Sequence, residues 1–208
     1  MVITRINSVE DLYSELINYG YPNYFTSVTQ SNSTITCLDG VMAPLIFESD
    51  VDSGWVRIYN LRVYESMLAE NAIRIKNVIR TQYGLIITGA KEYYGEYIEI
   101  PYIIITKDNA ENTVIFAHPS NIWDSQYIIK GEFVCMSSAG PEFAKHDSPG
   151  MDYSGDLLTS MVPVVCVGVM NYCPYLNWII QKQYSINGEL ISGTHHYWTD
   201  GQIALLDT

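Results

Sequence analysis

Met161-Val-Pro-Val-Val-Cys-Val-Gly-Val-Met170 is the most apolar run of this 208-residue chain, and the fold prediction starts from it. Its many valines favour a buried strand. Downstream, Asn187-Gly188 and Asp200-Gly201 each stand between strand-like segments. Such pairs are the strongest short-range hairpin signal, because both central residues of a type I′ turn need positive φ. We therefore predict a buried strand followed by a three-strand meander that ends near Leu206.

The N-terminal segment carries the clearest helix signal. Ser8 and Asp11 have the spacing of a capping box, with Asp in the place of the usual Glu or Gln. Gly20 follows at a distance that suits a helix C-terminus. Between them, four apolar residues fall on one helical face: Leu12, Tyr13, Leu16 and Ile17. We predict a helix here that packs against a sheet.

A second helix is predicted near residues 65–80. Leucine, alanine and isoleucine recur at helical spacing through Tyr64–Arg80, and Ala, Glu, Met and Leu near its start favour a helix. Ile73 and Ile75 also alternate with basic residues, as they would in a strand. A strand is therefore the alternative for this segment.

Most other segments have the composition of strands separated by turns. Gln30–Ser33 and Asp39-Gly40 predict two successive hairpins. Pro101 within Glu96–Thr106 indicates an edge strand or a bulge. By contrast, Ser137–Asp156 contains five Gly and Pro residues and no apolar periodicity. We predict a long loop there, of the kind that is usually functional or disordered.

Together these patterns predict a mainly β (β-rich α+β) fold. The expected architecture is an antiparallel sandwich or jelly-roll-like sheet with the N-terminal helix and the second helix near 65–80. No repeat, low-complexity tract or linker divides the sequence, so residues 1–208 are expected to form a single domain.

The charge composition narrows the classes of partner. Charged residues make up 16% of the chain, against roughly 25% in an ordinary soluble domain. With 23 acidic and 11 basic residues, the net charge of −12 argues against direct binding of nucleic acid or of an anionic membrane. It suits a basic protein partner.

The N-terminal segment and the length of the apolar runs indicate where the protein is located. The N-terminal segment lacks the apolar core of a signal peptide, and no run has the length of a membrane span. We expect the protein to be cytoplasmic or incorporated into an assembly.

The spacing between the cysteines does not match that of a metal-binding motif. None of the four forms a Cys-x-x-Cys motif, so neither a zinc site nor a redox motif is predicted, and no metal or cofactor is expected. We expect buried, reduced thiols, while three disulfide pairings stay open. The four residues are Cys37, Cys135, Cys166 and Cys173.

No catalytic motif stands out, and the candidates for acid–base chemistry come from the predicted loop. A histidine that titrates near neutral pH, oriented by a carboxylate, forms a general acid–base pair. A solvated polar loop contains the same residue types, which is the competing interpretation. The candidates are Glu142, His146, Asp147 and Asp152.

Aromatic residues are the most distinctive feature, with seventeen Tyr, four Trp and five Phe. Tyr and Trp offer large contact areas with a polar tip, which suits interfaces and the stacking of sugar rings. They also pair across β-strands for purely structural reasons. The candidate binding residues are Tyr93, Tyr94, Tyr97, Tyr153, Tyr197 and Trp198.

These observations favour a non-enzymatic interaction or structural protein that contacts a protein partner, or forms homo-oligomers, through an aromatic, neutral-polar and acidic β surface. A subunit of a viral or phage assembly, or an acidic inhibitor or immunity protein that caps a basic partner, fits this description. The alternative is a glycan-binding or glycan-hydrolysing β-sandwich, in which tyrosine rings and a carboxylate pair form the site.

Overall fold

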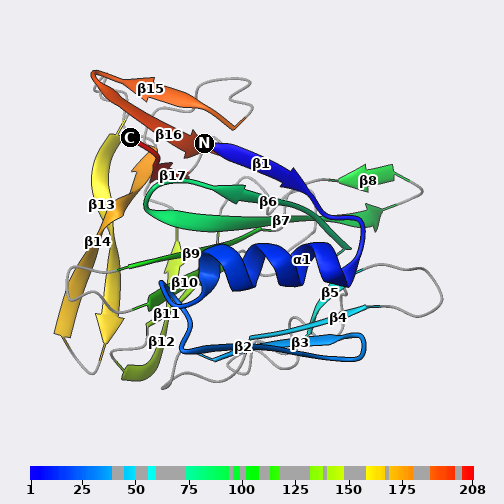
Figure 1. Cartoon of the computed structure of the whole chain (residues 1–208). Coiled ribbons are helices and arrows are strands. Elements are labelled where there is room, and N and C mark those ends of the chain that lie inside the picture. Colours follow the sequence, from blue (N-terminus) through cyan, green and yellow to red (C-terminus); the bar gives the residue numbers. More distant parts are fainter. Residues whose placement is uncertain are drawn as a thin grey trace.

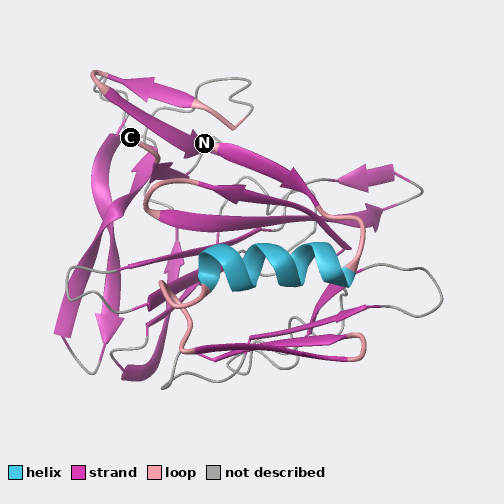
Figure 2. Cartoon of the chain, in the orientation of Figure 1, coloured by secondary structure: helices cyan, strands magenta, loops and turns pink. Residues whose placement is uncertain are grey.

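The computed structural model describes residues 1–38, 45–49, 56–59, 74–93, 96–98, 102–107, 113–117, 132–137, 140–147, 158–166, 169–179, 188–199 and 203–208. Strands predominate among these residues, and one helix lies near the N-terminus (Figure 2). The prediction of a mainly β, antiparallel fold with an N-terminal helix is confirmed. Within the described ranges, no helix is long and apolar enough to cross a membrane.

The larger sheet contains twelve of the described strands. They are β1 (Val2–Arg5), β2 (Ser27–Ser31), β3 (Thr34–Leu38), β4 (Leu45–Ser49), β5 (Val56–Tyr59), β6 (Arg74–Arg80), β7 (Gly84–Tyr93), β8 (Glu96–Ile98), β9 (Tyr102–Lys107), β10 (Thr113–Ala117), β11 (Glu132–Ser137) and β12 (Gly140–Asp147). Their order is β12-β11-β10-β9-β7-β6-β5-β4-β3-β2, with β1 beside β6 and β8 beside β7 (Figure 1). The first predicted N-terminal hairpin is present as the pair β2–β3, where Ser31 faces Thr34. β3 also pairs with β4, but Cys37 faces Leu45, so the connection is longer than the tight turn predicted at Asp39-Gly40, and residues 39–44 lie outside the described ranges.

The smaller sheet contains the five C-terminal strands. They are β13 (Leu158–Cys166), β14 (Val169–Ile179), β15 (Leu190–Ser192), β16 (His195–Thr199) and β17 (Ile203–Leu206), in the order β13-β14-β17-β16-β15. The strands β15, β16 and β17 pair in succession, so a three-strand meander is present. Of the two predicted turns, Asp200-Gly201 lies between paired strands. Thr199 faces Ala204, so this connection is longer than the predicted two-residue turn, and residues 200–202 lie outside the described residues.

The other turn signal joins no pair of described strands. Gly188 has the positive φ of +81° that a turn requires, but Asn187 lies outside the described residues. The turn that pairs β15 with β16 is Gly193-Thr194, where Ser192 faces His195 and Gly193 has φ +62°. A Gly-X pair with positive φ at glycine has the composition of a type II′ hairpin turn, which is a weaker sequence signal than Asn-Gly or Asp-Gly.

The apolar run Met161–Met170 was wrongly predicted as one strand. It is divided between β13 and β14, and Cys166 is the antiparallel partner of Val169. Because the run folds back on itself, the backbone N–H and C=O groups of its two halves form hydrogen bonds with each other. A single strand of that length would have needed two other strands to satisfy the same groups.

The N-terminal helix is built as predicted. α1 (Val9–Glu15) begins with a capping box, in which the Asp11 N–H donates to Ser8 Oγ at 3.2 Å and the Ser8 N–H donates to Asp11 Oδ2 at 3.2 Å. It continues as the π-helical turn η1 (Leu16–Gly20). The helical segment ends at Gly20. A Cβ atom at this position would come within 3.1 Å of the Phe25 ring.

Alternating residues of the central strands belong to two different cores. Leu85 and Ile87 pack with Leu12 and Leu16 of the helical segment, together with residues of β2–β4 such as Phe47. The larger sheet therefore curves around α1, which lies between β6–β7 and β2–β4 (Figure 1).

The opposite face of the same strands supports the smaller sheet. Ile86 and Ile104 pack with Leu176, Trp198 and Leu205, all of which are 5% exposed or less. Two antiparallel sheets thus bury their facing side chains against each other, as in a β-sandwich.

The predicted helix near residues 65–80 is wrong for its described part. Arg74–Arg80 forms β6, which pairs with β1, β5 and β7, while residues 60–73 lie outside the described ranges. Val78 faces the helix core, and the next residue, Ile79, packs on the opposite core. Burial on both faces and pairing on both edges outweigh helix propensity, which is a weak preference.

The predicted loop Ser137–Asp156 is also partly wrong. Gly140–Asp147 forms β12, which pairs with β11, and the register shifts between Met136 and Ser137. β12 is the last strand in its sheet order. An edge strand tolerates Pro141 and needs no apolar alternation, so its sequence resembled a loop.

The strand predicted over Glu96–Thr106 is present as β8 and β9, which both pair with β7. Pro101, predicted to mark an edge strand or a bulge, lies outside the described residues, so that interpretation stays a prediction.

Gly84→Ala tests the close approach of three strands. A Cβ atom at Gly84 would lie 2.6 Å from the Ile105 carbonyl oxygen and 3.0 Å from Leu205 Cδ2. We expect a loss of about 1–3 kcal/mol of unfolding free energy, because backbone atoms would have to move. Chemical denaturation followed by circular dichroism measures it.

Gly193→Asn is the control, since Gly193 has open space around its Cα and asparagine tolerates positive φ. A Gly84→Ala variant as stable as this control would contradict the packing described.

Candidate functional site

The predicted acid–base residues do not form a described site. Glu142, His146 and Asp147 lie along β12, where His146 is paired with Phe133 and Asp147 with Glu132. Asp152 lies outside the described residues. Among the residues that the structure describes, no group of three or more His, Cys, Asp or Glu is placed to hold a metal ion.

The predicted aromatic binding residues fall into two places. Tyr93 and Tyr97 lie in the β7–β8 hairpin, paired with Glu96 and Glu92 respectively. Tyr197 and Trp198 lie on β16 with 8% and 5% of their surface exposed, so little of either ring is left for contact with a partner. Tyr94 and Tyr153 lie outside the described residues.

Two of the four cysteines have described side chains. Cys37 and Cys173 are buried thiols, as expected. Burial raises the pKa of the Cys37 thiol from 9.0 to about 12, which makes it a poor nucleophile at neutral pH. The Cys173 thiol lies 3.1 Å from the Lys107 carbonyl oxygen.

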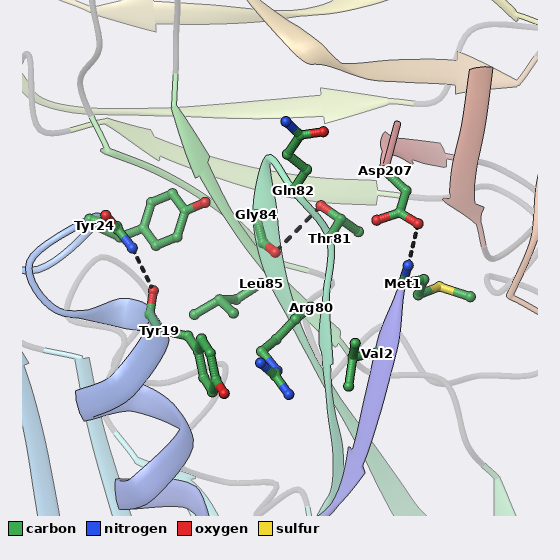
Figure 3. Close-up of a pocket in the computed structure, with 11 residues that line it drawn as sticks. Met1, Val2, Tyr19, Tyr24, Arg80, Thr81, Gln82, Gly84, Leu85 and Asp207 are labelled. Carbon is green, nitrogen blue, oxygen red and sulfur yellow. Dashed lines mark hydrogen bonds and ion pairs between the residues drawn. The ribbon is translucent and has the colours of Figure 1, made fainter. Parts of the chain in front are cut away.

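A cavity among the described residues lies elsewhere, at the C-terminal end of the helical segment. It has a volume of about 300 Å³. Tyr19 and Tyr24 lie on the helix side, Met1 and Asp207 on the opposite side, and the turn between β6 and β7 lies between them (Figure 3). Its lining residues, here called the helix-end pocket, are Met1, Val2, Tyr19, Asn23, Tyr24, Arg80, Thr81, Gln82, Gly84, Leu85 and Asp207.

Hydrogen bonds hold the β6–β7 turn that forms one wall of this pocket. The Thr81 N–H donates to the Gly84 carbonyl at 3.0 Å, and Thr81 Oγ1 accepts from the Tyr83 N–H at 3.1 Å. Thr106 Oγ1 in turn donates to the Tyr83 carbonyl at 2.7 Å. The turn is therefore closed locally by Thr81 and anchored to β9, which leaves Gln82 exposed at its tip.

The charged groups of the pocket are paired with one another. Arg80 Nε lies 3.1 Å from Glu15 Oε2, with 21% and 12% of the two side chains exposed. The Arg80 guanidinium also lies over the Tyr19 ring, 3.6 Å from its centroid. Across the pocket, the Met1 amino group contacts the Asp207 carboxylate. Each charged group of the lining therefore has a neighbour of opposite charge, which for Arg80 is Glu15, a residue outside the lining.

Tyr24 connects the pocket to a group of partly buried tyrosines. Burial, followed by the neighbouring Tyr175 and Cys173, raises the pKa of Tyr24 from 10.0 to about 12. The Tyr24 carbonyl accepts a hydrogen bond from Thr113 Oγ1 at 2.6 Å, and the rings of Tyr83 and Tyr175 stack with their centroids 4.4 Å apart. Tyr24 thus contributes a neutral side chain to the wall of the pocket.

A second feature adjoins the pocket at β1. This strand pairs with β6 in a register in which Val2 faces Arg80, and the Ile6 N–H donates to the Lys76 carbonyl at 2.8 Å. Because hydrogen-bonded positions alternate in an antiparallel ladder, Ile3 and Arg5 direct their N–H and C=O groups away from β6. No described strand pairs with this outer edge.

The side chains of β1 are unusually exposed for apolar residues. Val2 is 51% exposed and Ile3 is 59% exposed. Successive side chains of a strand point to opposite faces, so the outer edge has an apolar residue on each side. Such an edge is a template for pairing with another strand.

The chain matches no known family model, no curated protein and no solved structure. Any functional conclusion therefore depends on the pocket and the β1 edge.

The pKa of Tyr24 predicts a loss of stability at high pH. Its folded-state pKa of about 12 exceeds the ordinary value of 10.0, so the neutral phenol contributes stability that is complete below pH 10.0 and is lost as the pH rises towards 12. Tyr24→Phe removes this ionisation. We expect the unfolding free energy of the wild type to fall more steeply than that of Tyr24→Phe in this range, by on the order of 1–2 kcal/mol.

Urea denaturation at a series of pH values measures this difference. Tyr21→Phe is the control, because Tyr21 is 43% exposed. Parallel pH profiles for the wild type and Tyr24→Phe would contradict the burial of a neutral Tyr24.

Proposed function

We propose that the protein is a non-enzymatic interaction module that binds an extended, basic segment of a protein partner by β-strand addition to β1. The observation that carries the proposal is the outer edge of β1, which no described strand pairs and which has exposed apolar residues on both faces. In this mode of recognition, main-chain hydrogen bonds supply affinity and alternate side chains supply specificity.

The backbone of β1 offers a defined ladder to such a segment. Ile3 and Arg5 each present one donor and one acceptor on the outer edge, as the β1–β6 register requires. Each hydrogen bond contributes about 0.5–1.5 kcal/mol net. The added strand would also cover Val2 and Ile3, whose burial contributes further through the hydrophobic effect.

The net charge selects between a partner and a second copy. Two copies with a net charge of −12 each repel one another, whereas a basic segment is attracted and its association is accelerated. The same charge argument favours an inhibitor-like role towards a basic protein over self-assembly. The proposal concerns an interaction and includes no catalytic step.

Ile3→Pro tests the strand-addition mode. Proline removes an N–H that points away from β6, so the β1–β6 ladder keeps its hydrogen bonds while an added strand loses a donor and meets the ring. The probe is a fluorescent peptide of alternating lysine and valine, and binding is measured by anisotropy. We expect the wild type to bind it, and Ile3→Pro to bind about tenfold more weakly.

Three controls separate backbone, side-chain and charge effects. Ile191→Ala removes a side chain of similar exposure, 57%, from another strand and should leave binding unchanged. A peptide of alternating glutamate and valine should bind more weakly than the lysine peptide, and added salt should reduce that difference. Equal binding by wild type and Ile3→Pro, or a mass that doubles with concentration in light scattering, would contradict the proposal.

A further inference from the structure

We infer that the helix-end pocket binds a small, neutral, polyhydroxylated ligand of the saccharide class. This inference is independent of strand addition at β1. It also places a glycan site at residues other than the carboxylates Glu142, Asp147 and Asp152 that the sequence suggested. The argument rests on a stacking surface, on planar hydrogen-bonding groups, and on the internal pairing of the pocket charges.

Tyr19 supplies the stacking surface. The Arg80 guanidinium, which is ion-paired with Glu15, covers one face of this ring at 3.6 Å from its centroid, so a sugar ring would stack on the opposite face. Tyr19 nevertheless remains 39% exposed. The C–H groups on one face of a sugar ring carry partial positive charge and are attracted to the negative face of an aromatic ring.

Planar polar groups also line the pocket. The Asn23 amide donates from Nδ2 to the Tyr19 carbonyl at 3.3 Å, which orients its oxygen as an acceptor. Gln82 is exposed at the tip of the β6–β7 turn, and Arg80 lines the pocket. An amide combines a donor and an acceptor, and a guanidinium has several donors in one plane, so both groups match neighbouring hydroxyls on a sugar.

The charge balance favours a neutral ligand over an anionic one. Glu15 already compensates Arg80, and the Met1 amino group is compensated by Asp207. An anion would therefore meet no uncompensated positive charge in the lining, and it would approach a protein with a net charge of −12. A cation would likewise find Asp207 and Glu15 occupied.

The volume limits the size of the ligand. A cavity of about 300 Å³ lies at the lower end of the range for small-molecule sites, roughly 300–1,000 Å³. This favours a single sugar unit, free or at the end of a chain, over an extended oligosaccharide lying within the cavity.

The test is a titration of the ¹⁵N-labelled protein with neutral sugars and their matched uronates, followed by amide chemical shifts. The probes are glucose, galactose and N-acetylglucosamine, with glucuronate and galacturonate as the anionic counterparts. We expect at least one neutral sugar to shift the amides of Tyr19, Asn23 and Gln82 with an affinity in the millimolar range, about −4 kcal/mol. The matched uronate should bind more weakly.

Tyr19→Ala should weaken this binding by about tenfold, because it removes the stacking surface. Tyr21→Ala is the matched control, since Tyr21 is similarly exposed at 43% and does not line the pocket. Tyr19→Phe keeps the ring and should retain the affinity, which distinguishes stacking from a loss of folding. Ile3→Pro should leave the sugar titration unchanged, so that failure of strand addition and failure of the pocket are separately visible.

Two outcomes would overturn the inference. The first is the absence of pocket shifts with every neutral sugar at concentrations well above the millimolar range. The second is tighter binding of a uronate than of its neutral counterpart, which would make the pocket an anion site centred on Arg80.

Discussion

The burial of the central strands on both faces is the constraint on which the rest of the structure depends. In β7, Leu85 and Ile87 pack under the helical segment, while Ile86 packs under the smaller sheet. Neither layer can be removed without exposing one face of the same strand. Because the side-chain period of a strand is two, a slip of one residue would exchange the two cores, so the register of β6, β7 and β9 is strongly specified.

Both candidate sites arise where this three-layer arrangement ends. Gly84 allows β7, β9 and β17 to approach closely, and immediately before it the β6–β7 turn emerges beside the end of η1. The helix-end pocket lies at this corner. β1 is added to β6 at the same corner and has no described partner on its outer edge. The features proposed to bind a partner and a ligand are therefore adjacent, with Met1 and Val2 lining the pocket.

The sequence predicted local features well and their surroundings poorly. The capping box of Ser8 and Asp11 and the hairpin around Gln30–Ser33 depend on a few neighbouring residues, and the described residues agree with both. Arg74–Arg80 was expected to be helical, because its pairing with β1, β5 and β7 involves distant segments. The burial of the candidate site residues was also not predictable, because an aromatic residue such as Trp198 has the same sequence signature whether it is buried or exposed.

The sequence by itself determined the acidic, charge-poor character of the chain, its mainly β composition and the position of its N-terminal helix. These properties follow from composition and from interactions within one turn or one hairpin. Only the tertiary structure decided that Tyr19, Arg80 and Asp207, which are far apart in the chain, line one pocket. It also decided that Val2 and Ile3 lie on an open edge. The physical reason is that burial and strand pairing depend on which distant segments meet, and no local pattern records that choice.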